Sequence, residues 1–149
     1  MPISINPMMM RQIIMDHYEH PHNKRIPSKD GYLKINMNST SCIDNIDVFL
    51  LAENGIVKDC CFDGVGCTIS TASTSIMTDL VIGKTFEEAK QIIDNYRKMI
   101  AEDEFDEELL EEAIVFINTS KQASRIKCAT IGWNGLEELL NESNGEKHG

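Results

Sequence analysis

Three cysteines and one aspartate stand where they could share a metal ion. Cys42 and Asp44 lie two residues apart, a spacing that directs both side chains to one side of extended backbone. Cys67 directly follows Gly64-Val65-Gly66 at the expected start of a helix, where the helix end favours a thiolate. Cys128 lies early in the last expected helix. Three thiolates and one carboxylate form a four-ligand set that tetrahedral zinc accepts.

Spacing alone leaves a second interpretation of these cysteines open. The gaps between them are long and match no short signature such as paired Cys-x-x-Cys, and a cysteine is often only a small buried hydrophobe. The chain has five cysteines and no apparent secretion signal, so we expect no disulfide framework. Cys60 and Cys61 are adjacent on an expected strand and must point to opposite faces, and we assign both to packing.

Three strands are predicted ahead of most of the helices. Residues 32–38 alternate in polarity, residues 46–52 and 56–62 are apolar, and Glu53-Asn54-Gly55 between the last two is a hairpin turn. The pattern therefore predicts an antiparallel meander. In a short meander, the link that holds Cys42 and the end of the third strand before Cys67 fall at the same edge of the sheet.

The helices frame this sheet. One helix is expected to end before Pro21, Thr85 and Glu88 form a capping-box pattern, and Asp106 is a candidate N-cap. The polar tail 141–149 is expected to be disordered. The order of strands and helices therefore predicts that residues 1–149 form a single α+β domain, in which helices pack on one face of a three-stranded antiparallel sheet. Helices are expected at about 8–20, 67–82, 85–100, 106–117 and 124–140.

Composition excludes several classes of partner. The 149 residues carry a formal net charge of -10, which a phosphate backbone would repel, so a nucleic acid is not expected. No apolar run approaches the roughly 20 residues that span a bilayer. The N-terminal segment lacks the pattern of a signal peptide, and we expect a cytoplasmic protein.

Four segments resemble the U-type iron–sulfur cluster assembly proteins, the IscU/NifU N-domain family. They are "IIMDHYEHPHNKR", "NSTSCIDNIDVFL", "FDGVGCTISTASTSIMTDLVIGK" and "SRIKCATIGWNGLEELL", which stand in the family's order between residue 10 and about residue 140. The resemblance implies that Cys42, Asp44, Cys67 and Cys128 hold a metal. One departure is Ile43, which stands where the family has glycine between the cysteine and the aspartate. If the family's loop needs positive φ, Ile43 is strained or the loop is rearranged; otherwise Ile43 covers the site.

Two features are similar to the SufU branch of this family. Lys127 stands where cluster scaffolds usually have histidine, and residues 84–106 resemble the helical insertion of SufU proteins. The branch implies a zinc-dependent sulfurtransferase. Such a protein accepts persulfide sulfur on Cys42 from a pyridoxal-phosphate-dependent cysteine desulfurase and supplies a downstream iron–sulfur scaffold. The alternatives are a scaffold that assembles a transient [2Fe–2S] cluster on the same four residues, or a structural zinc domain.

Charged and imidazole side chains near these motifs have two interpretations. Arg125 and Lys127 flank Cys128 and could stabilise the thiolates or orient Asp44, or they could be exposed charges on a helix.

His17, His20 and His22 lie close together in sequence at the end of the first helix. They could be ligands, but a solvated helix end or a partner surface is the preferred interpretation.

Overall fold

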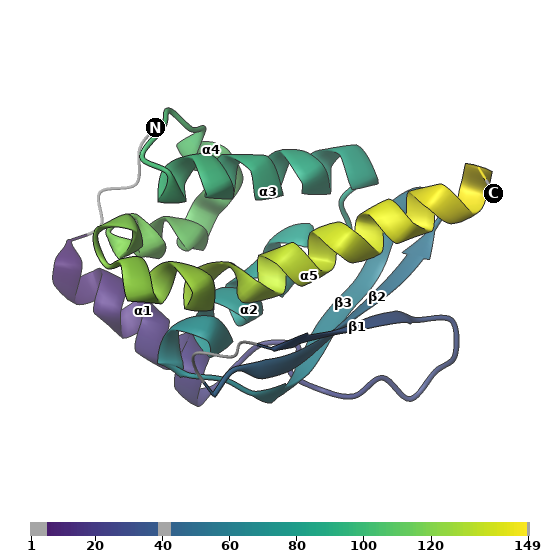
Figure 1. The fold of residues 1–149 in the computed structure, drawn as a ribbon, viewed down its shortest axis with the longest axis horizontal. Helices are drawn as coiled ribbons and strands as arrows, with labels where there is room; N and C mark the ends of the chain where they lie inside the picture. Colours follow the sequence, from purple (N-terminus) through teal and green to yellow (C-terminus); the bar gives the residue numbers. More distant parts are fainter. Residues whose placement is uncertain (1–5, 39–42, 149) are drawn as a thin grey trace.

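The computed structural model describes residues 6–38 and 43–148, with the side chains of residues 120 and 144–148 left out. An antiparallel sheet in the order β1-β2-β3 carries helices on one face (Figure 1). This confirms the expected α+β class. The elements are α1 (Pro7–Glu19), β1 (Leu33–Asn38), β2 (Asn45–Glu53), β3 (Ile56–Val65), α2 (Thr68–Val81), α3 (Phe86–Ile100), α4 (Glu107–Leu110), the 3-10 helices η1 (Glu111–Phe116) and η2 (Thr119–Lys121), and α5 (Ala123–His148).

The hairpin register brings two parts of the candidate site together. Asn54 and Gly55 have φ of 55° and 75°, the positive values that a tight hairpin turn requires, and they join β2 to β3. The pairing continues to the far end of both strands, where Asn45 lies opposite Val65. Asp44, just before β2, is thereby placed beside the chain that leaves β3 toward Cys67.

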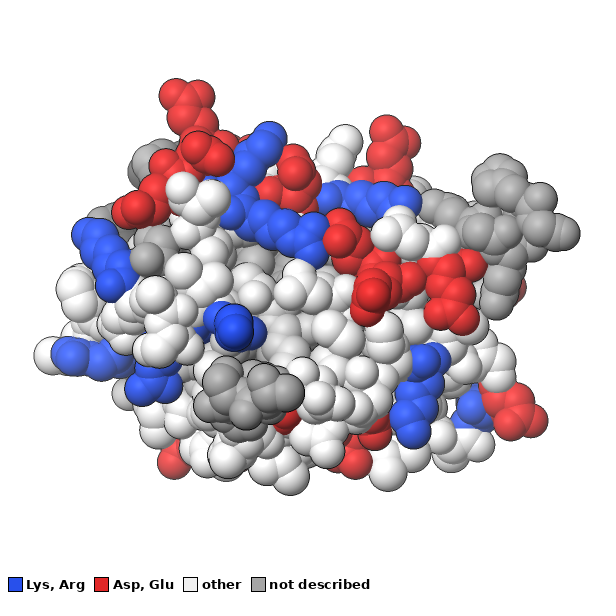
Figure 2. Space-filling model, in the orientation of Figure 1, with Lys and Arg blue, Asp and Glu red and all other residues white. Residues whose placement is uncertain are grey.

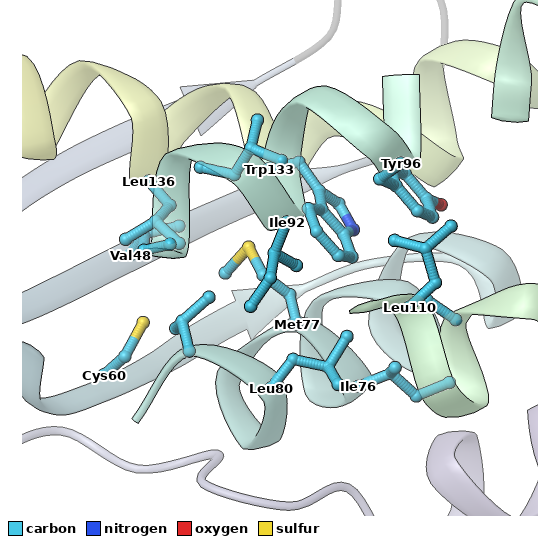
Figure 3. Packing of buried hydrophobic residues seen from close by; sticks show 14 of the residues in the cluster. Val48, Cys60, Ile76, Met77, Leu80, Ile92, Tyr96, Leu110, Trp133 and Leu136 are labelled. Carbon is cyan, nitrogen blue, oxygen red and sulfur yellow. The ribbon is translucent and has the colours of Figure 1, made fainter. Parts of the chain in front are cut away.

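Helix α2 is the centre of the core, and almost all of its residues are buried. Helix α5 crosses it at a glycine: a Cβ on Gly132 would lie 2.4 Å from Thr74 Oγ1, so only glycine permits this approach. Farther along α5, Trp133 stacks on Tyr96 of α3, with ring centroids 3.9 Å apart. Figure 3 shows Trp133, Tyr96 and Met77 within one continuous cluster. Helices α2, α3 and α5 therefore share a single core.

The free edge of the sheet along β3 is also partly covered. Residues 23–25 run beside β3, with Arg25 N donating to Phe62 O at 2.8 Å and Phe62 N donating to Asn23 O at 3.1 Å. Cys60 lies in the core between sheet and helices, and Cys61 is buried on the other face. The assignment of both cysteines to packing agrees with this burial.

Two expected boundaries were wrong. Asp106 caps a helix as predicted, but α4 ends at Leu110, because Glu111 has φ of 44° and the chain continues as the 3-10 helix η1. The last helix does not end near residue 140, because α5 continues to His148. Adding a residue to a formed helix fixes one residue for one hydrogen bond, so a polar segment can extend a packed helix that it could not nucleate.

Candidate metal centre

Three separate parts of the chain meet at the end of the sheet and bring Asp44, Cys67 and Cys128 together: the residue before β2, the residue before α2, and α5. Their ligand atoms, one carboxylate oxygen and two sulfurs, all lie within 4.8 Å of one another. Asp44 is 2% exposed and Cys128 is 6% exposed. Three residues that are distant in sequence therefore lie together as one compact donor set.

The carboxylate of Asp44 is held in place by the start of α2. Its Oδ1 accepts hydrogen bonds from Cys67 N at 2.9 Å and from Ser70 Oγ at 2.8 Å. Bonds of this kind fix the orientation of a metal-binding carboxylate. Sequence analysis missed Ser70. Its position three residues after a cysteine at a helix start is the only signal that could have pointed to it.

Cys67 is both a candidate ligand and the N-cap of α2. Its sulfur accepts from Ser70 N at 3.4 Å, so the sulfur faces the positive end of the helix dipole. The preceding Gly66 is required for space, because a Cβ there would lie 2.5 Å from Ser70 Oγ. Gly64 adopts φ of 119°, which favours glycine. The Gly-Val-Gly segment thus turns the chain and leaves room for the Ser70–Asp44 contact.

Cys128 enters the group from α5 as a buried thiol. Burial raises the pKa of the Cys128 thiol, and the neighbouring Cys67 and Asp44 raise that pKa further. A buried group of acids is unfavourable when all are charged, and a bound cation removes that repulsion. The donor set therefore fits a divalent cation that prefers thiolates, of which zinc is the usual case.

Cys42, the fourth expected ligand, lies outside the described residues. Its neighbour Ile43 is 68% exposed, and the expectations about the backbone at this position stay predictions.

Arg125 and Lys127 are both exposed near the start of α5. Arg125 lines a cavity of about 300 Å³ together with Arg11 and Ile14 of α1. Neither residue has a recorded hydrogen bond or ion pair to Asp44, Cys67 or Cys128 within the described part of the chain. Their expected role beside the ligands therefore stays a prediction. Of the three histidines, His17 and His22 come together and His20 does not join them.

Acidic side chains gather away from this site. Figure 2 shows many of them along the edge over α3 and α4, where the sequence has its acidic stretch, with basic side chains among them there and others at the end that holds α1. None of the described helices is both long enough and apolar enough to cross a membrane.

Comparison with known proteins identifies similar chains. The model of the NifU-like N terminal domain matches residues 9–136. The iron-sulfur cluster assembly scaffold protein IscU of Streptococcus pyogenes serotype M1 is 36% identical, over 91% of this chain and 85% of that protein. The zinc-dependent sulfurtransferase SufU of Bacillus subtilis (strain 168) is also 36% identical, over 92% of each chain.

Solved structures share the fold over nearly the same span. A putative iron-sulfur cluster assembly scaffold protein for the SUF system from Fervidobacterium islandicum AW-1 superposes with a TM-score of 0.76 at 34% identity. The match covers 87% of this chain and 94% of that one. The two names found among the relatives, scaffold and sulfurtransferase, define the two functions to be weighed.

Proposed function

Because the chain belongs to the NifU-like N-terminal domain family of IscU and SufU proteins, we propose that it is a zinc-dependent sulfur acceptor in iron–sulfur cluster assembly. It receives persulfide sulfur on Cys42 from a cysteine desulfurase and passes that sulfur to a downstream scaffold. The observation that carries the proposal is the convergence of Asp44, Cys67 and Cys128 at one buried point. Cys42, two residues before Asp44 in the sequence, is the cysteine to which the family resemblance assigns the acceptor role.

In this proposal zinc is held by Asp44, Cys67 and Cys128, with Cys42 as the fourth ligand. Bound zinc supplies a positive charge that keeps thiols deprotonated near neutral pH. The residues of the chain do the rest: Ser70 and the Cys67 amide orient the carboxylate, and burial keeps competing water from Cys128.

The transfer itself is a thiol–persulfide exchange. The Cys42 thiolate attacks the outer sulfur of the desulfurase persulfide, a new S–S bond forms on Cys42, and the S–S bond of the donor breaks. The donor cysteine leaves as a thiolate and takes up a proton. Sulfur at the persulfide oxidation level moves from one protein to the other, so no further oxidant or reductant is needed.

Lys127 favours sulfur transfer over cluster assembly. A protonated lysine is a poor metal ligand, whereas a neutral histidine at this position would be a good one. Lys127 is exposed at the start of α5 and leaves the site with the thiolate-rich set that zinc accepts. The alternative function, a scaffold for a [2Fe–2S] cluster, uses the same thiolates and is supported by the relative named IscU.

We further propose that the chain works in the cytoplasm. The proposed chemistry needs the thiols of Cys42, Cys67 and Cys128 in their reduced form, a state that reducing compartments maintain.

Two measurements test the function together. Incubation with desulfurase, pyridoxal phosphate and cysteine should add one sulfur to the peptide that contains Cys42, detected by mass spectrometry, and should stimulate the conversion of cysteine to alanine. Cys42→Ser should abolish both effects. A Cys42→Ser protein that stimulates the desulfurase at the wild-type rate would exclude Cys42 as the acceptor. Anaerobically purified protein should hold about one zinc per chain and be colourless; visible absorption from stoichiometric iron and sulfide would instead support the scaffold.

A further inference from the structure

We propose that His17, His22 and Asp79 form a second metal site, separate from the cysteine centre, that binds a first-row divalent cation such as Zn²⁺. The three residues come from α1, from the loop after α1 and from the end of α2. Their ligand atoms, two imidazole nitrogens and one carboxylate oxygen, lie within 4.8 Å of one another.

The two imidazoles already face each other across this group. Their ring centroids are 4.4 Å apart, and His22 Nδ1 lies 2.5 Å from Asp79 Oδ2. Tetrahedral zinc with bonds of about 2.0–2.1 Å holds its ligand atoms roughly 3.4 Å apart. His22 and Asp79 are 49% and 40% exposed and can adjust to that spacing, whereas His17 is 3% exposed and provides a fixed anchor.

Polar neighbours orient His17 and Asp79 as they do at established metal sites. His17 Nε2 lies 3.0 Å from Glu112 Oε1. When Nε2–H donates to that carboxylate, the lone pair of His17 is on Nδ1, on the side of Ser75 Oγ at 2.7 Å. A carboxylate behind a histidine is the usual support of a metal-binding imidazole. On Asp79, Asn23 Nδ2 donates to Oδ1 at 3.1 Å and leaves Oδ2 toward the histidines.

A cation at His17 Nδ1 would replace the hydrogen bond that the Ser75 hydroxyl donates there, and Ser75 Oγ would keep the hydrogen bond that it accepts. Ser75 Oγ also accepts from the backbone N–H of His22 at 2.7 Å, and this bond does not involve the imidazole of His17. The same backbone bond fixes the position from which the side chain of His22 extends. The loop after α1 thus presents His22 to the group in the absence of any metal.

The ligand types point to the class of cation. Two imidazoles and one carboxylate suit Zn²⁺, Co²⁺, Ni²⁺ or Cu²⁺, whereas Mg²⁺ and Ca²⁺ prefer oxygen alone. Because His22 and Asp79 are partly exposed, water can occupy the remaining coordination positions of the cation. The bound cation would tie the end of α1 to α2, the helix whose other end carries Cys67.

The test titrates Co²⁺ into protein that already holds one equivalent of Zn²⁺. We expect a second equivalent to bind and to give visible d–d bands without the near-ultraviolet charge transfer of a Co²⁺–thiolate bond. His22→Gln and Asp79→Asn should each weaken this binding at least tenfold and leave the first zinc in place. Both positions are partly exposed, and circular dichroism checks that the variants are folded.

His20→Gln is the matched control, since His20 is in the same segment and outside the group; it should bind the second cation as the wild type does. The proposal is overturned if the wild type takes up no second equivalent, if Co²⁺ shows thiolate charge transfer, or if His20→Gln loses binding as His22→Gln does.

Discussion

Ser70 links the carboxylate of Asp44 to the helix that begins at Cys67. Its hydroxyl donates to Asp44 Oδ1 at 2.8 Å in a fully buried position. Removing a partner that orients a metal ligand typically lowers metal affinity by about 10- to 100-fold. We therefore expect Ser70→Ala to lose zinc to a chelator at a concentration about tenfold lower than the wild type does, measured by competition with a coloured chelator.

Thr74→Val is the control for that measurement. Thr74 Oγ1 donates to Ser70 O inside α2 and does not touch the ligands, so this variant should lose some stability and keep its zinc affinity. Equal zinc affinity in Ser70→Ala and the wild type would show that Ser70 does not orient Asp44.

Cys60 and Cys61 should be unreactive in the folded protein. Burial raises the pKa of Cys61 to about 11 and raises the pKa of Cys60 further, so the thiolate is scarce at pH 8. Iodoacetamide at pH 8 should leave both cysteines unmodified, and mass spectrometry after guanidinium denaturation should show that they then react. Rapid alkylation of Cys61 in the folded protein would contradict its buried position.

Among the elements, α3 belongs to the core although its segment resembles an insertion. Tyr96 stacks on Trp133 of α5 and donates its hydroxyl hydrogen to Ala129 O at 2.8 Å. The helix starts with a complete capping box, in which Thr85 Oγ1 accepts from Glu88 N and Glu88 Oε1 accepts from Thr85 N. Local capping and distant packing thus stabilise the same helix.

Thr85→Ala should reduce the free energy of unfolding by about 1 kcal/mol, because it leaves an N-terminal amide of α3 without its cap. Thr85→Ser keeps the hydroxyl and should remain within a few tenths of a kcal/mol of the wild type. Urea unfolding followed by Trp133 fluorescence measures both. If α3 unfolds independently of the core, Trp133 will report no change for Thr85→Ala, and the helix is then not coupled to α5.

At the scale of the whole molecule, Asp59 ties the loop after α1 to the sheet. It accepts hydrogen bonds from Arg25 at 2.8 Å and from Tyr32 at 2.5 Å. Burial alone would raise the pKa of Asp59, but the bonds from Tyr32 and Arg25 outweigh burial and hold that pKa below its usual value. A carboxyl with a lowered pKa stabilises the fold above its unfolded pKa, near 3.9, and loses this contribution as pH falls through the folded pKa.

We therefore expect stability to fall below about pH 4, and Asp59→Asn to show a flatter acid dependence with a lower stability at pH 7. Thermal unfolding between pH 2.5 and 7 tests this. Asp94→Asn is the control, because Asp94 is exposed and its ion pair among the described residues is with Lys98, one helical turn away on the surface; its acid dependence should match the wild type. Identical profiles for Asp59→Asn and the wild type would exclude the role of Asp59.

The sequence by itself determined the elements whose signals are local. The Asn54-Gly55 turn, the Thr85/Glu88 capping box and the stop before Pro21 each depend on neighbouring residues, so they could be read without a fold. The antiparallel meander followed from the short links, and it placed Asp44 beside Cys67. The four segments that resemble the IscU/NifU family named the candidate ligands.

Only the tertiary structure decided which distant residues meet. Cys128 reaches Asp44 because α5 crosses α2 closely at Gly132, a contact that no local pattern encodes. The contact of Ser70 with Asp44 and the approach of His17 to Asp79 depend on the same packing of α2 against its neighbours. The break at Glu111 and the extension of α5 to His148 were also missed. Helix ends are decided by small differences in free energy, which the packed core can shift in either direction.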